Sequence, residues 1–176
     1  GCEIRNCVNS GDISFLETGG NRNYAGGITA YADIVENSCS YGSIAGVNLA
    51  GAVAYTASSN ISEVINSYGL SGGATSAAQA VASASGTMKS VGTFASADGQ
   101  LTAADGHTLE YVPEGELPEG QTYVSYAFNQ YLAENAGNGL RLWTAVPNGS
   151  SVYQPVGEIL TGAAQTEVTI SQSVTP

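Results

Sequence analysis

Short apolar stretches, separated by polar turn residues, recur along the chain up to Gly72. Two of them match position by position and begin at Ile4 and Val35: each has a β-branched residue, an Asn two positions later, then a Gly and an Ile. A third stretch begins at Val64 and then departs from the pattern. A period of roughly 30 residues with short strands is typical of a repeat architecture.

A second, small-residue apolar element lies between these stretches. It covers residues 26–31 and again residues 50–55, so Gly26 aligns with Ala50 and Tyr31 with Tyr55, and it is too short for a stable helix. Two elements in the same order favour stacked strands, and a β-sandwich with accidental similarity is the alternative. Stacking predicts two rows in adjacent parallel strands: Ile4, Val35 and Val64 buried inside, and a ladder of Asn6, Asn37 and Asn66 beside them.

Two segments carry a resemblance to a known repeat. They read Tyr-Ala-Gly-Gly-Ile-Thr-Ala-Tyr at 24–31 and Leu-Ala-Gly-Ala-Val-Ala-Tyr at 49–55, each followed by a Val/Ile-x-Asn-Ser/Cys element. This pattern resembles the GLUG motif of bacterial surface and adhesin-like proteins over roughly residues 3–72, with Ala50 and Ala54 in place of glycines. The resemblance implies a right-handed parallel β-helix and an extracellular location, and it carries no catalytic residues.

The composition changes after Gly72. Residues 73–85 are small and low in complexity, and a weak Ala-rich helix and a loose linker both remain open. The segment from Lys89 to Val112 is typical of strands, and Asp105-Gly106 predicts a hairpin between Leu101 and Leu109. An acidic, turn-rich loop follows at residues 113–120.

The clearest helical pattern covers residues 122–136, with Thr122 at its start and Gly137 at its end. Its apolar face consists of Val124, Ala127, Phe128, Tyr131 and Leu132. A strand at residues 140–146 holds Trp143, which we expect in the same core, and residues 151–156 return from it. A stack of strands leaves an open end, so this helix is predicted to cap it. Residues 167–174 alternate well enough for one more strand.

The expected fold is therefore mainly β. Residues 1–72 form a short right-handed parallel β-helix, and residues 73–176 form a C-terminal α+β capping segment of the same unit. Both ends of the chain are interpreted as cuts in a longer protein.

Charge excludes some classes of partner. Four Lys and Arg stand against 15 Asp and Glu, for a formal net charge of −11. Nucleic-acid binding needs cations to neutralise phosphates, and an anionic membrane surface is disfavoured in the same way. No apolar run approaches the ~20 residues of a spanning helix.

The three cysteines are Cys2, Cys7 and Cys39, and the one histidine is His107. Without a CxxC pair, a zinc site is not expected. In the proposed register Cys39 aligns with Val8 and Cys7 with Ser38, one position apart, so a Cys7–Cys39 disulfide is not expected either.

Carboxylates are the remaining candidates for chemistry. An acidic group that suggests calcium lies in the second half of the chain: Asp98, Asp105, Glu110, Glu114, Glu116 and Glu119. It fits no EF-hand loop, and a solvated acidic face explains it better. The carboxylates of the repeats are Glu3, Asp12, Glu17, Asp33, Glu36 and Glu63. Glu36 aligns with Arg5, so the repeats do not build a row of acids as a polysaccharide-cleaving β-helix does.

The sequence thus predicts no catalytic, cofactor or metal site and no enzyme. It favours a non-enzymatic extracellular module of a bacterial surface protein with an adhesin-like binding or stalk role. Its partners are expected to be a host or matrix glycan or protein and the rest of a larger surface protein. Ten tyrosines suit such contacts, although most have structural explanations. A polysaccharide-active β-helix enzyme fragment and a purely structural spacer are the alternatives.

Overall fold

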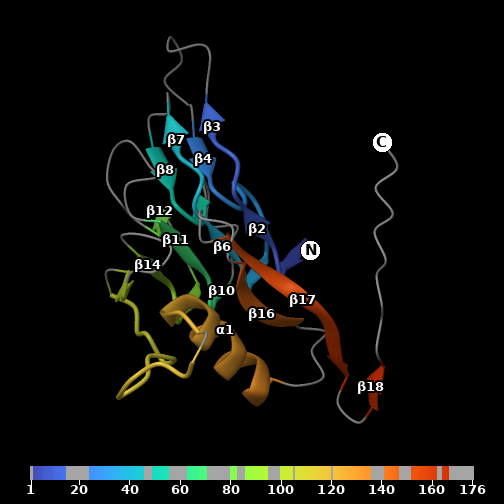
Figure 1. The fold of residues 1–176 in the computed structure, drawn as a ribbon. Helices are drawn as coiled ribbons and strands as arrows, with labels where there is room; N and C mark the ends of the chain where they lie inside the picture. The colour runs from blue at the N-terminus through green and yellow to red at the C-terminus, as the bar shows by residue number, and fades with distance from the viewer. Residues whose placement is uncertain are drawn as a thin grey trace, which may run out of the picture.

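The computed structural model describes residues 2–14, 24–45, 49–55, 63–70, 80–82, 86–94, 100–104, 106–119, 121–135, 141–146, 152–161 and 164–166. Within these ranges the chain is mainly β, with parallel sheets and one helix (Figure 1). The expected fold class is confirmed at this level.

Most of the strands belong to four successive layers, which we call rungs 1 to 4. Rung 1 contains β1 (Glu3–Arg5), β2 (Val8–Asn9), β3 (Ile13–Ser14) and β4 (Tyr24–Gly26). Rung 2 contains β5 (Ile34–Glu36), β6 (Cys39–Ser40), β7 (Ile44–Ala45), β8 (Leu49–Gly51) and β9 (Ala54–Tyr55). Rung 3 contains β10 (Glu63–Ile65), β11 (Tyr68–Leu70) and β12 (Val81–Ala82), and rung 4 contains β13 (Thr87–Lys89) and β14 (Gly92–Phe94).

Equivalent strands of successive rungs pair in parallel. The first strands form the sheet β1-β5-β10-β13, in which Ile4 pairs with Val35 and Val35 with Val64. Val35 and Val64 are fully buried and Ile4 is half-buried against the same apolar cluster. The predicted inward row and its parallel register are therefore confirmed.

The predicted asparagine ladder is also confirmed. The Asn37 side-chain Nδ2 donates to Asn6 Oδ1 at 3.0 Å, and Asn66 Nδ2 donates to Asn37 Oδ1 at 2.8 Å. All three residues have positive φ, between 44° and 54°. Asn tolerates this left-handed region better than most residues, so the ladder position turns the chain and links the rungs at once.

The repeat extends past residue 72, where the sequence places its end. Met88 pairs with Val64, and Ser90 takes the ladder position with a φ of 51°. The sequence pattern missed this fourth rung because Met and Ser replace the β-branched residue and the Asn. The spacing from Val64 to Met88 is also shorter than the spacing between the earlier members of the row.

The ladder gives a first testable expectation. We expect Asn37→Ala to lower the free energy of unfolding by about 2–4 kcal/mol, since it strains a positive-φ residue and removes two side-chain hydrogen bonds, one buried and one half-buried. Asn37→Gly relieves the strain and loses only the hydrogen bonds, so it should be the milder of the two. Urea denaturation of both variants measures the difference, and equal losses would contradict the role of φ.

The register of the small-residue element differs from the expected one. Gly26 pairs with Gly51 and Thr29 bridges to Ala54, which is one position further along than the alignment of Gly26 with Ala50. A Cβ on Gly26 would collide with the Thr29 carbonyl, so close approach fixes a glycine there. Tyr31 and Tyr55 are consequently not equivalent: Tyr31 is 65% exposed and Tyr55 is buried.

Helix α1 (Tyr123–Glu134) follows the predicted pattern. Thr122 caps its start, with a reciprocal hydrogen bond from Ser125, and Asn135 ends it. All five residues of the predicted apolar face are buried: Val124, Ala127, Phe128, Tyr131 and Leu132. The predicted end at Gly137 lies outside the described residues.

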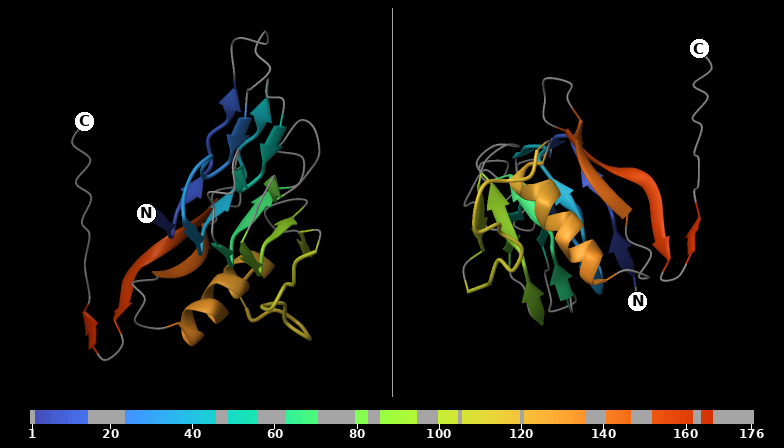
Figure 2. Two further views of the ribbon diagram at one scale, coloured as in Figure 1. Left: turned by 180° about the vertical axis from the view of Figure 1, so that it is seen from behind. Right: turned by 60° about the horizontal axis from the view of Figure 1, so that its bottom comes forward.

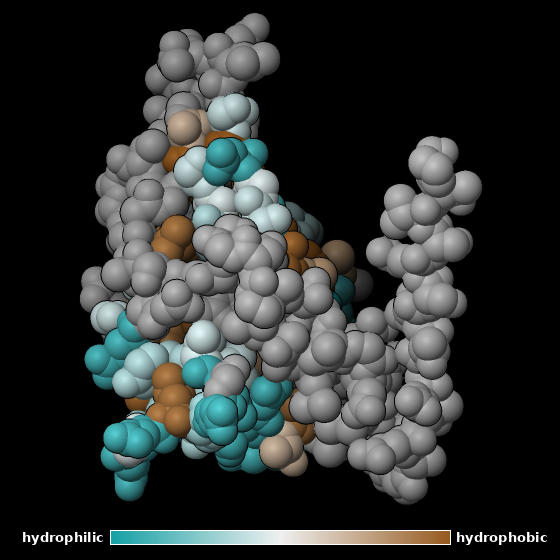
Figure 3. All heavy atoms as spheres, in the orientation of Figure 1, coloured by the Kyte–Doolittle hydropathy of each residue, from teal (hydrophilic) through white to brown (hydrophobic). Residues whose placement is uncertain are grey.

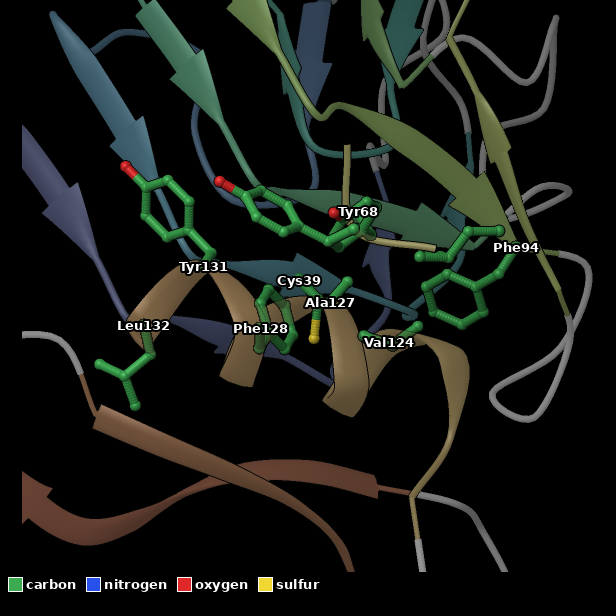
Figure 4. Close-up of a cluster of buried hydrophobic side chains, with 10 residues drawn as sticks. Cys39, Tyr68, Phe94, Val124, Ala127, Phe128, Tyr131 and Leu132 are labelled. Atoms are coloured by element: carbon green, nitrogen blue, oxygen red, sulfur yellow. The ribbon is translucent and has the colours of Figure 1, made fainter. Parts of the chain in front are cut away.

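The position of the helix is the main correction to the expected architecture. Instead of covering the open end of the stack, α1 lies across the face of the sheet that contains β6, β11 and β14 (Figure 2). Cys39, Tyr68 and Phe94 on these strands pack directly against it (Figure 4). The large apolar side chains of these strands share one face, which the helix buries, and the opposite face carries Ser40, Gly69 and Thr93. A separate apolar cluster around Val35 is built from other segments.

The edge of this sheet is paired by β15 (Leu101–Ala103), which runs antiparallel to β14. The hairpin therefore joins residues 92–94 to 101–103, and the hairpin predicted at Asp105-Gly106 is wrong, since Leu109 belongs to no strand. Instead the His107 N–H donates to the Ala104 carbonyl and closes a turn.

Beyond the helix, β16 (Arg141–Val146) pairs antiparallel with β17 (Val152–Thr161), and β18 (Ala164–Thr166) pairs with β17. This confirms the strand and its return. The Trp143 side chain and the strand predicted at residues 167–174 lie outside what the structure describes. Of residues 73–85, only Ala80–Ala82 are described, and Val81–Ala82 form a strand rather than a helix or linker.

Candidate functional site

Three charged side chains and a tyrosine converge where the first sheet meets helix α1. This group, which we call the charged junction, consists of Glu3, Arg5, Glu36 and Tyr131. Strand pairing sets Arg5 opposite Glu36, and the Arg5 Nε donates to Glu36 Oε2 at 2.5 Å. Arg5 Nη1 also contacts Glu3 Oε2 at 2.7 Å. The Tyr131 hydroxyl donates to the other Glu36 oxygen, Oε1, at 2.5 Å. The junction thus joins two rungs to the helix.

Burial and hydrogen bonding raise the pKa of two of these groups, Arg5 and Tyr131. Glu36 is only 4% exposed, and its hydrogen bond to Arg5 is the largest cause that raises the pKa of the guanidinium. Burial, followed by the bond to Glu36, raises the pKa of the Tyr131 phenol above its usual value. At neutral pH the Arg5 guanidinium is therefore charged and the Tyr131 phenol is neutral.

This geometry is more typical of a structural link between two strands and a helix than of a catalytic site. Each Glu36 oxygen already accepts a strong hydrogen bond, and the second carboxylate, Glu3, lies on the far side of Arg5. The sequence-derived alignment of Arg5 with Glu36 is confirmed. The contact from Tyr131 was not predictable, because it joins residues 95 positions apart that share no local pattern.

The acidic segment does not converge on one point in the part that is described. The Ser90 hydroxyl donates to Glu110, and the Tyr111 hydroxyl donates to Glu134. Among the described residues no group of three His, Cys, Asp or Glu side chains is close enough to hold a metal ion. Asp98 and Asp105 lie outside the described residues, and His107 is half-buried in its turn.

The cysteines lie in three different environments. Cys2 is exposed, Cys7 is half-buried, and Cys39 is buried beneath α1, all as free thiols. Cys39 pairs with Val8, and the Cys7 N–H donates to the Ser38 hydroxyl, which confirms the predicted register. Burial raises the pKa of the Cys39 and Cys7 thiols, the opposite of what a nucleophilic cysteine requires.

Tyrosines divide between the core and the surface. Tyr68, Tyr111 and Tyr131 belong to the cluster under α1. Tyr24 stacks on Tyr55 with ring centroids 4.6 Å apart, while Tyr31 is the large apolar side chain most open to solvent among the described residues. On the face drawn in Figure 3, the described apolar residues form separate patches between hydrophilic ones.

A hollow of about 520 Å³ opens on rung 1. Its described lining comes from this rung alone: Ile4, Cys7, Val8, Asn9, Gly11, Asp12, Ile13, Gly26, Gly27 and Ile28. Ile4 and Ile28 also pack against the apolar cluster that contains Val35 and Val64. The hollow therefore lies at the rung 1 end of this cluster, where no other described rung covers it.

No family model, curated protein or solved structure matches this chain. No helix within the described ranges has the length and apolar character needed to cross a membrane.

Proposed function

We propose that this chain is a non-enzymatic, extracellular module of a bacterial surface protein, with an adhesin-like binding or stalk role. The observation that supports it is the register shared by four rungs, in which Ile4, Val35, Val64 and Met88 follow one another across parallel strands. A chain wound in this way is stiff along the stack, because each rung is bonded to its neighbours.

In this proposal the rungs wind as a right-handed parallel β-helix, the geometry that the GLUG-like segments imply. Crossovers between parallel strands of one sheet are right-handed in nearly all proteins, which supports the same hand. The charged junction and the cluster under α1 attach the helix to this stack and stiffen its side.

The proposal places the chain outside the cell, where Tyr31 and the rest of the surface meet a glycan or protein partner. Antibodies raised against the chain should label intact cells of the source organism, and protease added outside the cells should remove the label. Labelling that appears only after permeabilisation would contradict the proposed location.

Binding is tested separately. The full chain should compete with intact cells for attachment to immobilised matrix proteins or neutral glycans. Release of reducing ends from a polysaccharide panel by the purified chain would favour the enzyme class instead.

A further inference from the structure

The asparagine ladder runs in one direction, and a tyrosine hydroxyl donates to its last member. Each side-chain nitrogen donates to the asparagine oxygen of the rung before it, from Asn66 to Asn37 and from Asn37 to Asn6. A fourth asparagine in this series would donate to Asn66 Oδ1. The Tyr68 hydroxyl donates to this oxygen instead, at 2.6 Å, and neither Asn66 nor Tyr68 has exposed surface.

We propose that the Tyr68 hydroxyl terminates the ladder in place of a fourth asparagine, so that the chain itself limits the ladder to three rungs. A buried acceptor without a donor is costly, and Asn66 Oδ1 would be one if the ladder simply stopped. Tyr68 supplies the donor from within rung 3, since it stands two residues after Asn66. The inference does not depend on the proposed function.

Ser90, at the ladder position of rung 4, keeps the turn but not the bond. Its φ of 51° matches that of the ladder asparagines. A hydroxyl has a single proton to donate, and Ser90 donates it to Glu110 Oε2 at 3.1 Å. Burial raises the pKa of the Tyr68 phenol well above its ordinary value, so Tyr68 keeps the proton that it donates to Asn66.

A second row of hydrogen bonds ends at the same corner. The residues after the ladder asparagines are Cys7, Ser38 and Ser67. Ser38 Oγ accepts from the Cys7 N–H at 3.1 Å, and Ser67 Oγ accepts from the Ser38 N–H at 3.3 Å. In rung 4 the residue after Ser90 is Val91, whose side chain has no polar group to continue this row. The change from Asn-Ser to Ser-Val therefore ends both rows together.

The segment that follows rung 4 returns to this corner and covers it. Strand β15 pairs with β14, and the Ala104 N–H donates to the Val91 carbonyl at 3.0 Å. Glu110 accepts from Ser90 a few residues later. Residues 101–110 thus satisfy backbone and side-chain groups that another rung would otherwise have to meet.

The Tyr68 ring connects the end of the ladder to helix α1. It packs in the cluster under the helix and meets Phe128 edge-on, with ring centroids 5.5 Å apart. This packing holds the hydroxyl beside Asn66. Because Tyr68→Phe retains the ring and its contacts, it isolates the contribution of the hydroxyl.

Urea denaturation of Tyr68→Phe, with two changes at Ser90, tests the proposal. We expect Tyr68→Phe to lower the folding equilibrium constant about ten- to a hundredfold, since Asn66 Oδ1 loses its donor. Ser90→Asn supplies a new donor from rung 4. Ser90→Gly is its matched control, because glycine also accepts the positive φ and also loses the bond to Glu110. The advantage of Ser90→Asn over Ser90→Gly should be about five- to tenfold larger in the Tyr68→Phe chain than in the parent chain.

A measurement on the parent chain keeps the test independent of how well the variants fold. In proton nuclear magnetic resonance spectra, the Tyr68 hydroxyl proton should exchange slowly with water and show an Overhauser contact to the side-chain amide of Asn66. Three results would each overturn the proposal: a Tyr68→Phe chain that unfolds at the parental urea concentration, an equal advantage of Ser90→Asn in both backgrounds, or a Tyr68 hydroxyl proton in fast exchange with water.

Discussion

Replacing Phe128 by alanine is expected to lower the free energy of unfolding by about 3–5 kcal/mol. The side chain has no exposed surface, and its ring meets Tyr68 edge-on with centroids 5.5 Å apart. It stands at the centre of the cluster that attaches α1 to β6, β11 and β14 (Figure 4). Such a loss is a large share of the ~5–15 kcal/mol that holds a typical domain together.

Gln130→Ala is the matched control for Phe128→Ala. Gln130 lies on the same helix but is exposed, so this change alters helix propensity without opening a cavity. Urea denaturation followed by circular dichroism should show a near-parental midpoint for the control and a strongly lowered one for Phe128→Ala. Equal midpoints for both variants would mean that α1 does not pack on the sheet.

Alkaline pH is expected to destabilise the chain between pH 8 and pH 11, by roughly 1–3 kcal/mol for each buried acid that keeps its proton while the unfolded chain releases it. Burial raises the pKa of the Cys39 thiol above its ordinary value of 9.0, and burial raises that of the Tyr68 phenol well above 10.0. The folded chain therefore keeps protons that the unfolded chain releases. The stability that these groups contribute is fully present below about pH 9 and is lost as the pH rises.

Cys39→Ala separates the two contributions. The thiol ionises first in the unfolded chain, so removing it should reduce the loss seen at pH 11 by about 2–3 kcal/mol. Urea denaturation of both chains at pH 8 and pH 11 measures this, with the variant compared with itself across pH. A parental loss of stability in Cys39→Ala would show that other groups control the alkaline transition.

The local pattern was enough to predict the first strand of each of the first three rungs and the helix. Alternation and the recurring Asn place Ile4, Val35 and Val64 in register, and the apolar positions of α1 repeat at helical spacing. These features depend on residues close together in the sequence or on a repeat that copies itself. The fourth rung was not predicted, because Ser90 has the positive φ of the ladder position but is not an asparagine.

The placement of the helix was not predictable from the sequence. On β6 and β11 the apolar residues Cys39 and Tyr68 lie on one face, with Ser40 and Gly69 on the other. This alternation does not say that the apolar face meets a helix rather than the interior of the stack. The bond from Tyr131 to Glu36 depends on that placement, so the charged junction could not be assembled in advance. One-residue errors of register, as at Gly26, likewise arise where small residues repeat without distinctive neighbours.

The side-chain amides of Asn6, Asn37 and Asn66 provide the most direct test of the stacked rungs. In a sample labelled at asparagine nitrogen, nuclear Overhauser spectra should connect the amide protons of Asn37 with Asn6 and those of Asn66 with Asn37, but not Asn66 with Asn6. Parallel strands in this register bring only neighbouring members within hydrogen-bond distance. Absence of both connections, or Hα–Hα contacts typical of antiparallel pairing between β1 and β5, would contradict the parallel rungs.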